Sequence, residues 1–214
     1  MACCPKSVIA EILKAKGTIK SVYFVACGGS YAGLHPGKYF LESESKELKV
    51  DHYSSNEFCH ATPKSLGANS IVITQSSSGN TPETVKAAEI AQKAGAASIV
   101  ITNKPESPLA QNGDYVLVPE KGSTANSGQG YSLQLAVEIL NQTEGYENYD
   151  EMYNGFDRID KIVGNATKFI APRAEKWAKQ YKDEKLIYTM GSGSAHSVAY
   201  SFAICLLMEM QWIN

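Results

Sequence analysis

The segment from Ile71 to Lys86 constrains the fold of this chain more than any other part of it. Residues 71–73 form an apolar, β-branched run, which is typical of a buried strand. Pro82 stands where a helix would begin. Between strand and helix lies Gly79 within a dense set of hydroxyl side chains, namely Thr74, Ser76, Ser77, Ser78 and Thr81. The segment therefore predicts a strand, a tight loop and a helix N-terminus in direct succession.

The loop in this segment has the composition of an anion site. A helix start presents unpaired N–H groups and a partial positive charge, so it can hold an anion without Lys or Arg. Serine hydroxyls add rotatable donors. The alternative is that these residues are ordinary helix caps, but one cap would suffice. The run from Ser76 to Ser78 at the carboxyl end of an apolar strand favours a phosphate ester held by neutral groups.

Strand-like and helix-like segments alternate through Val118. The apolar runs are Lys20–Ala26, Leu48–Tyr53, Ser70–Thr74, Ala97–Thr102 and Tyr115–Val118, and the helix-like segments are Tyr31–Glu44, Pro82–Ala94 and Ser107–Gln111. Strands that are apolar throughout and alternate with helices favour a parallel sheet covered on both faces. The expected fold is therefore α/β: a doubly wound three-layer αβα sandwich with a mostly parallel five-stranded sheet.

The second part of the chain predicts a different organisation. An amphipathic helix at Tyr131–Leu140 precedes a polar linker at Asn141–Glu151 and a long helix near Asp157–Lys182. A strand-like segment at Lys185–Met190 is followed by Gly-Ser-Gly-Ser. This repeats the pattern of residues 21–30, where an apolar strand is followed by glycines and a serine. We therefore expect a first domain at 1–145, a linker and long helix at 146–184, and the beginning of a second, incomplete domain at 185–214 of a longer protein.

Composition excludes several function classes. The formal net charge is −2 and basic residues form no long run, which argues against nucleic acid and anionic membranes as partners. No apolar stretch reaches the roughly 18 residues of a membrane span. Five scattered cysteines indicate reduced thiols and a cytoplasmic protein. The Cys3-Cys4 pair has no partner at metal-ligand spacing, so neither a metal nor another cofactor is expected.

Two further polar loops are candidates for the same site. Gly28, Gly29 and Ser30 follow the first strand, where glycines allow backbone to approach a ligand. The alternative for Ser30 is a helix cap only, but the second loop favours ligand contact. A full G-x-G-x-x-G is absent, so dinucleotide binding fits poorly. Asn126 and Ser127, in the loop after the last strand, could close over a ligand or belong to a flexible surface loop.

The final helix, about Ser194–Trp212, carries one formal charge among apolar residues, that of Glu209. A carboxylate in apolar surroundings is costly unless it is paired or used, and burial would raise its pKa toward that of a general acid or base at neutral pH. The alternative is a structural ion pair. We expect His196, at the start of this helix, to be a polar residue of the cap region rather than a catalytic residue.

Several of these motifs resemble the sugar isomerase (SIS) domain family of phosphosugar-binding proteins. The matching residues are Cys27-Gly-Gly-Ser30, Gln75-Ser-Ser-Ser-Gly-Asn-Thr-Pro-Glu-Thr84 and Asn126-Ser127. The sequence is still more similar to bacterial fructosamine-6-phosphate (fructoselysine-6-phosphate) deglycases. Val22-Tyr-Phe-Val-Ala-Cys-Gly-Gly, Glu57-Phe58, Lys104-Pro-Glu-Ser-Pro-Leu-Ala-Gln and Leu207-Met-Glu-Met-Gln-Trp-Ile carry that similarity, which spans essentially the whole chain.

The resemblance implies a sugar 6-phosphate substrate, two tandem SIS domains, and a homodimer or higher homo-oligomer with the site between domains and subunits. It assigns the phosphate to Gly29, Ser30, Ser76, Ser77, Ser78 and Thr81, with Gly28, Asn126 and Ser127 as further substrate contacts. It makes Glu209 the catalytic base. A partner histidine in a His-Gly-Pro segment is absent from this chain, so we expect little or no turnover by the chain alone. A ketose–aldose isomerase or amino-sugar phosphate deaminase and a non-catalytic phosphosugar-sensing module are the alternatives.

Overall fold

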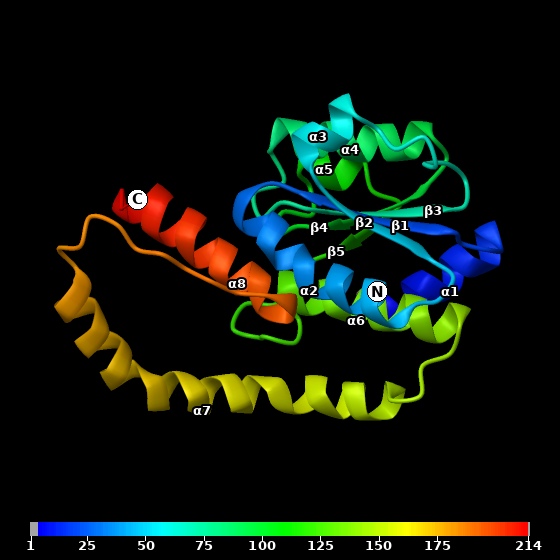
Figure 1. The fold of residues 1–214 in the computed structure, drawn as a ribbon. Coiled ribbons are helices and arrows are strands. Elements are labelled where there is room, and N and C mark those ends of the chain that lie inside the picture. The colour runs from blue at the N-terminus through cyan, green and yellow to red at the C-terminus, as the bar shows by residue number, and fades with distance from the viewer. Residues whose placement is uncertain (1–3, 214) are drawn as a thin grey trace.

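A computed structural model describes residues 4–213 and contains one five-stranded sheet (Figure 1). All four strand pairs are parallel, and the order across the sheet is β2-β1-β3-β4-β5. The strands are β1 (Ser21–Ala26), β2 (Lys49–Ser54), β3 (Ser70–Gln75), β4 (Ala97–Ile101) and β5 (Tyr115–Leu117). The expected five-stranded sheet is confirmed, and it is parallel throughout.

Helices cover both faces of the sheet, which confirms the expected three layers. One layer holds α1 (Pro5–Lys16), α2 (Gly28–Glu44) and α6 (Gly128–Thr143), and the other holds α3 (Ser55–His60), α4 (Pro82–Lys93) and α5 (Pro108–Gln111). The sequence analysis missed α1 and α3. Both are held by tertiary packing, since α1 buries Val8, Ile9 and Ile12 and α3 buries Phe58.

The three central strands are buried on both sides, which explains why they read as continuous apolar runs. Phe24 and Ile73 belong to the core cluster shared with α1, α2 and α6. Tyr23 and Val72, the alternate residues of the same strands, pack with Phe58 on the opposite face. Period-2 alternation thus separates two cores rather than a core from solvent.

The strand order reverses between β1 and β3. The chain leaves β1 through α2 on one face and leaves β3 through α4 on the other. The parallel register pairs Ala26 with Gln75, so the loops that follow these strands begin side by side. Open parallel sheets bind ligands outside the carboxyl ends of the strands at such a switch point.

Helices α2 and α6 approach very closely at Gly37. A Cβ atom added there would lie 2.3 Å from the backbone oxygen of Ser132. The Ser132 hydroxyl in turn donates to the backbone oxygen of Leu34 at 2.9 Å. These contacts lock the two helices that carry the loops after β1 and β5.

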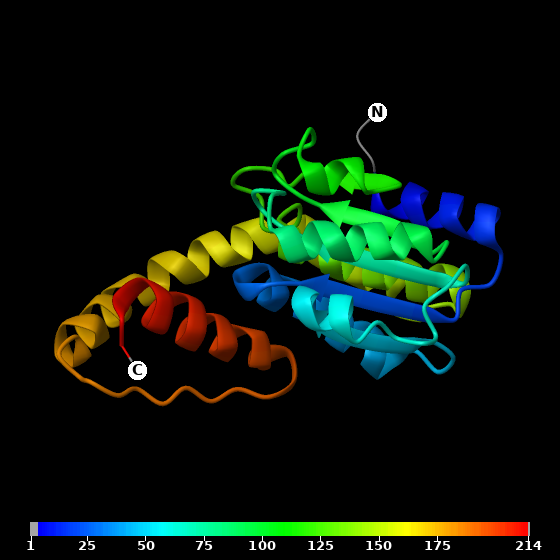
Figure 2. The same cartoon turned by 90° about the horizontal axis from the view of Figure 1, so that it is seen from above.

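The long helix α7 (Tyr149–Tyr181) starts eight residues earlier than expected and shortens the predicted linker. Its start is fixed by Glu138 of α6, a fully buried carboxylate that accepts hydrogen bonds from Tyr149 at 2.7 Å and from Tyr153. None of the residues of α7 is buried. The helix runs out past the sheet layers, and the chain then returns toward α2 (Figures 1 and 2).

The prediction of a strand at Lys185–Met190 was wrong, because these residues pair with no strand among residues 4–213. A lone extended segment has no ladder partner to satisfy its backbone. The predicted final helix is confirmed as a 3₁₀ turn (Gly193–Ala195), α8 (His196–Tyr200), a π-helical stretch (Ser201–Met208) and α9 (Glu209–Gln211). The expected domain boundaries remain a prediction.

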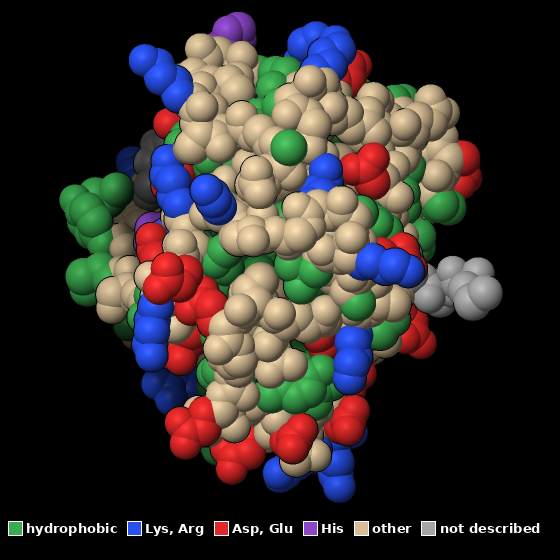
Figure 3. Space-filling model, turned by 90° about the vertical axis from the view of Figure 1, so that its right-hand side faces the viewer, with side chains coloured by type: hydrophobic (Ala, Val, Ile, Leu, Met, Phe, Trp, Pro, Cys, Tyr) green, Lys and Arg blue, Asp and Glu red, His purple; other side chains and the backbone are tan. Residues whose placement is uncertain are grey.

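Acidic and basic side chains are interspersed on the face shown in Figure 3, without a large patch of one sign. Within the described residues, no helix combines the length and apolarity that a membrane crossing needs.

The α2–α6 contact generates a stability prediction. Gly37→Ala is expected to destabilise the fold by about 1–3 kcal/mol, because the methyl group would overlap the Ser132 carbonyl. Gly164→Ala is the matched control, since Gly164 lies in α7 with no atom within 4 Å of an added Cβ. That change is expected to stabilise by about 0.5–1 kcal/mol through helix propensity. Urea unfolding measures both; equal shifts for the two variants would contradict the packing argument.

Candidate functional site at the switch point

The loop after β3 is folded by its own hydroxyl groups. The Gly79 amide donates to the Ser76 hydroxyl at 3.2 Å, and the Ser76 and Thr81 hydroxyls lie 3.0 Å apart. Gly79 has φ +67°, and a Cβ atom there would lie 2.0 Å from the Ser107 hydroxyl. Glycine is therefore required on both conformational and steric grounds. Ser77 and Ser78 stay exposed above this turn.

Helix capping distinguishes the switch point from the rest of the sheet edge. The N-cap serines of α3, α5 and α6 each accept a hydrogen bond from a helix amide. The N-cap residues of α2 and α4, Cys27 and Thr81, make no such side-chain bond. The two helices that flank the switch point thus lack the side-chain caps that satisfy the other three. Two such N-termini side by side favour an anion.

The loop after β1 completes this arrangement. Gly28 has φ +53°, and Gly29 is exposed. The hydroxyls of Ser30 and Ser77 make no hydrogen bond to another described residue, so both can serve a ligand. Because Ala26 and Gln75 pair in register, these hydroxyls belong to adjacent loops.

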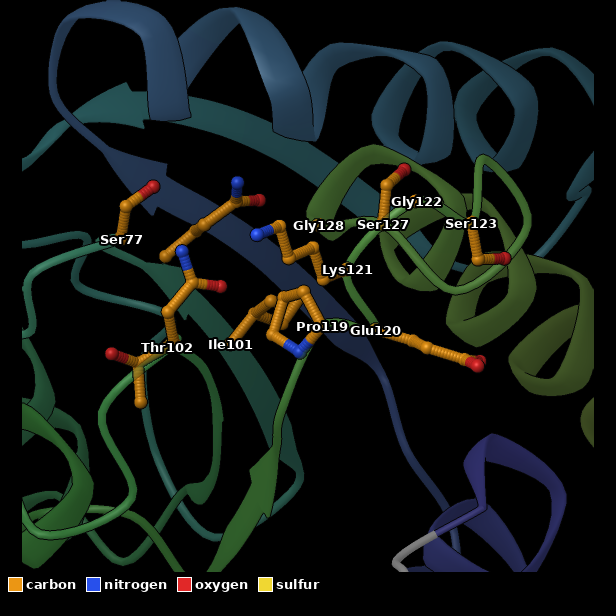
Figure 4. A pocket seen from close by; sticks show the side chains of 12 residues that line it. Ser77, Ile101, Thr102, Pro119, Glu120, Lys121, Gly122, Ser123, Ser127 and Gly128 are labelled. Carbon is orange, nitrogen blue, oxygen red and sulfur yellow. The ribbon is translucent and has the colours of Figure 1, made fainter. Parts of the chain in front are cut away.

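A cavity of about 600 Å³ opens at this edge of the sheet (Figure 4). It is lined by Gln75, Ser77, Ile101, Thr102, Asn103, Pro119, Glu120, Lys121, Gly122, Ser123, Ser127 and Gly128. Among the site residues expected from sequence, the structure brings Ser77 and Ser127 to this cavity. The others lie outside its lining, namely Gly28, Gly29, Ser30, Ser76, Ser78, Thr81, Asn126 and Glu209. The sequence analysis missed Lys121, which forms no ion pair in the described chain and whose side chain lies across the cavity between Ser77 and Ser127 in Figure 4. A lone lysine in a polar loop gives no sequence signal.

Asn126 and Ser127 are engaged within their own loop. The Asn126 amide donates to Glu120 at 2.9 Å. The Ser127 hydroxyl accepts from the Gly130 amide at 3.0 Å and donates to the Thr124 oxygen at 2.7 Å. Both side chains therefore shape the cavity wall, and only Ser127 lines the cavity.

Glu209 does not have the surroundings expected of it. Its side chain is exposed. Within residues 196–211, which form the C-terminal helix, only Ser197 and Leu207 are buried. The expectation of a carboxylate buried in apolar surroundings was wrong for the described residues. The helix nevertheless reaches the switch point, since the Cys205 Sγ lies 3.9 Å from a Cβ placed at Gly29. Glu209 follows Cys205 by about one turn.

Histidines connect this C-terminal helix to α2 and β2. The His35 ring lies 5.1 Å from that of His196 and 6.1 Å from that of His52, and Tyr31 stacks on His52 at 3.8 Å. His196 is the first residue of α8 and is exposed, as expected of a polar residue at a helix start, and its ring also packs on that of His35. Burial, reinforced by His35 and Lys38, lowers the pKa of His52 to about 3.

Neither this cluster nor any other group of at least three His, Cys, Asp or Glu residues is placed to hold a metal ion within residues 4–213. Cys3 of the Cys3-Cys4 pair lies outside the described residues, and Cys4 is exposed.

Comparison with known sequences points to one family. The profile of the SIS domain matches residues 18–141. The fructosamine deglycase FrlB of Bacillus subtilis (strain 168) is 46% identical over 205 residues, which are 94% of this chain and 62% of that protein. The fructoselysine 6-phosphate deglycase of Escherichia coli O157:H7 is 23% identical over 97% of this chain and 60% of its own length. The chain thus spans about three fifths of these curated relatives.

Solved structures with the same fold are found among phosphosugar proteins. A crystal structure of a candidate phosphosugar isomerase from Salmonella typhimurium LT2 has a TM-score of 0.95 and 46% identity, over 98% of this chain and 64% of that one. The C-terminal domain of a glucosamine-fructose-6-phosphate aminotransferase from Francisella tularensis shares the fold, with a TM-score of 0.82 at 18% identity, over 98% of this chain and 65% of that one.

The histidine cluster generates a pH prediction. The folded-state pKa of His52 is about 3 against 6.5 for an unperturbed imidazole, so the unfolded state takes up the proton first. Stability should therefore decrease as pH falls from about 6.5 toward 3, with His52 accounting for about 2 kcal/mol at pH 5. His52→Gln should reduce the difference in unfolding free energy between pH 7 and pH 5. His60→Gln, at an exposed position on α3, is the control; equal pH dependence in the two variants would refute this assignment.

Proposed function

This chain belongs to the SIS domain family, and we propose that it forms part of a fructosamine-6-phosphate deglycase. The substrate is a ketosamine 6-phosphate with the amine on C1 and the carbonyl at C2. The products are glucose 6-phosphate and a free amine or amino acid. The 46% identity to a fructosamine deglycase over 94% of the chain supports this choice of reaction.

The observation that carries the proposal is the pair of helix N-termini without side-chain caps at the strand-order switch. Helix N-termini attract anions, and the hydroxyls around these two supply neutral donors. We assign the phosphate to Ser30, Ser76, Ser78 and Thr81, with Ser77 contributing its backbone N–H. Gly28 and Gly29 let the backbone approach the phosphate oxygens.

Anchoring the phosphate would place the sugar carbons beside the C-terminal helix. Glu209 then removes a proton from C1, which gives an enaminol with a C1–C2 double bond. A proton returned to C2 leaves an imine at C1, and one water hydrolyses this imine to the aldehyde and the amine. Binding energy from the remote phosphate thus orients C1 for proton transfer. We expect substrate and the rest of the protein to enclose the Glu209 carboxylate.

We further propose that the whole protein is a homo-oligomer of two-domain subunits that supply the remaining site residues, including a histidine for ring opening. The free cysteines Cys27, Cys59 and Cys205 support a reducing, cytoplasmic location.

The proposal predicts that Glu209→Gln in the full-length protein lowers kcat on a ketosamine 6-phosphate by about 100-fold or more, because the base is lost. Binding of glucose 6-phosphate should change by less than about threefold, since the phosphate anchor is untouched. Glu151→Gln, at an exposed carboxylate on α7, is the matched control for charge removal. Release of glucose 6-phosphate, followed with a coupled dehydrogenase, measures the rate.

Turnover by Glu209→Gln at the wild-type rate would exclude Glu209 as the base. A wild-type protein that interconverts ketose and aldose phosphates without releasing amine would indicate an isomerase. Binding of sugar phosphate without any turnover would indicate a sensing module.

A further inference from the structure

Helix α7 holds the loop that forms one wall of the 600 Å³ cavity. Asp160, the twelfth residue of α7, accepts hydrogen bonds from the Ser123 hydroxyl at 3.0 Å, the Ala125 amide at 3.4 Å and the Thr124 amide. These donors belong to residues 118–127, which we call the β5–α6 loop. A single carboxylate thus binds three donors of one loop across 35 to 37 positions of sequence.

This loop is a thin partition between two cavities. Glu120, Lys121, Gly122 and Ser123 line the 600 Å³ cavity and also a second cavity of about 480 Å³ on the side of α7. Asp160 lines only the second cavity. Displacement of the loop toward α7 would therefore enlarge the first cavity at the expense of the second.

No other residue replaces the Asp160 contacts. The amides of Thr124 and Ala125 have no second acceptor among residues 4–213. Gln134 of α6 binds the Ala125 oxygen at 2.7 Å, which fixes one end of the loop to α6. The middle of the loop is fixed from the α7 side. The Thr124 hydrogen bonds lower the pKa of Asp160, as expected for a carboxylate that accepts several donors.

We propose that Asp160 is a positioning residue that sets the wall of the sugar-binding cavity by holding the β5–α6 loop. The part of the proposal that concerns substrate rests on the proposed function. Asp160 itself does not line the cavity and is joined to it by its hydrogen bonds with the β5–α6 loop, so its effect on substrate is indirect. The long helix outside the matched SIS region thereby takes part in shaping the site.

The test compares Asp160→Asn with Asp157→Asn in the full-length protein. Asp157 is also exposed on α7 and lines the same second cavity, but it makes no hydrogen bond or ion pair with a described residue. Asp160→Asn should raise KM for a ketosamine 6-phosphate about three- to tenfold, with kcat within about twofold. Asp157→Asn should leave both unchanged. Ser123→Ala removes one of the three donors and should raise KM by less.

Hydrogen exchange gives a readout that does not depend on the reaction. The amides of Thr124 and Ala125 should exchange faster in Asp160→Asn than in Asp157→Asn. Faster exchange with an unchanged KM would overturn the positioning role and leave only a structural contact. Unchanged exchange would overturn the anchor itself. If Asp160→Asn does not fold, Asp160→Ser decides by the same two criteria.

Failure of the proposed function is distinguishable from failure of this inference. A wild-type protein without deglycase turnover would contradict the former. The dissociation constant for glucose 6-phosphate would then replace KM, with the same expected ratio between the two aspartate variants. Equal dissociation constants would overturn the positioning role.

Discussion

The parallel pairing of β1 with β3 is the constraint on which the candidate site depends. It places the loops at Gly28–Ser30 and Ser76–Thr81 at one edge of the sheet, and the opposite departure of α2 and α4 leaves space between them. Both helices start there without a side-chain cap, unlike α3, α5 and α6. The site is therefore built chiefly from backbone N–H groups and neutral hydroxyls, whose positions the sheet register determines.

Much of this could be predicted from local sequence. Apolar β-branched runs marked the central strands because these strands are buried on both faces, and Gly79 marked a turn that no other residue can form. The failures share a cause, which is dependence on distant partners. Helix α7 begins at Tyr149 because Glu138 binds its tyrosines, and Lys185–Met190 forms no strand because it has no neighbour in the described chain. The engagement of Asn126 by Glu120 likewise leaves no signature in the sequence.

The remaining components reach the switch point from outside the sheet. The C-terminal helix packs on α2 through His35 and His196 and places Cys205, four residues before Glu209, beside Gly29. Asp160 of α7 holds the opposite wall. Under the proposed function, the sheet edge would bind the phosphate and the helices outside the sheet would adjust the surroundings of the sugar, an arrangement that lets one fold serve several phosphosugar reactions.

The most direct test of the central claim is calorimetric titration of the protein with glucose 6-phosphate and with glucose. If the uncapped N-termini and the Ser76–Thr81 loop bind the phosphate, glucose 6-phosphate should bind at least about 100-fold more tightly than glucose. Gly79→Ala should abolish that difference, because its methyl group would overlap Ser107 and open the turn. Equal affinities for the two sugars, or a Gly79→Ala variant that is folded and keeps the full preference, would contradict the account.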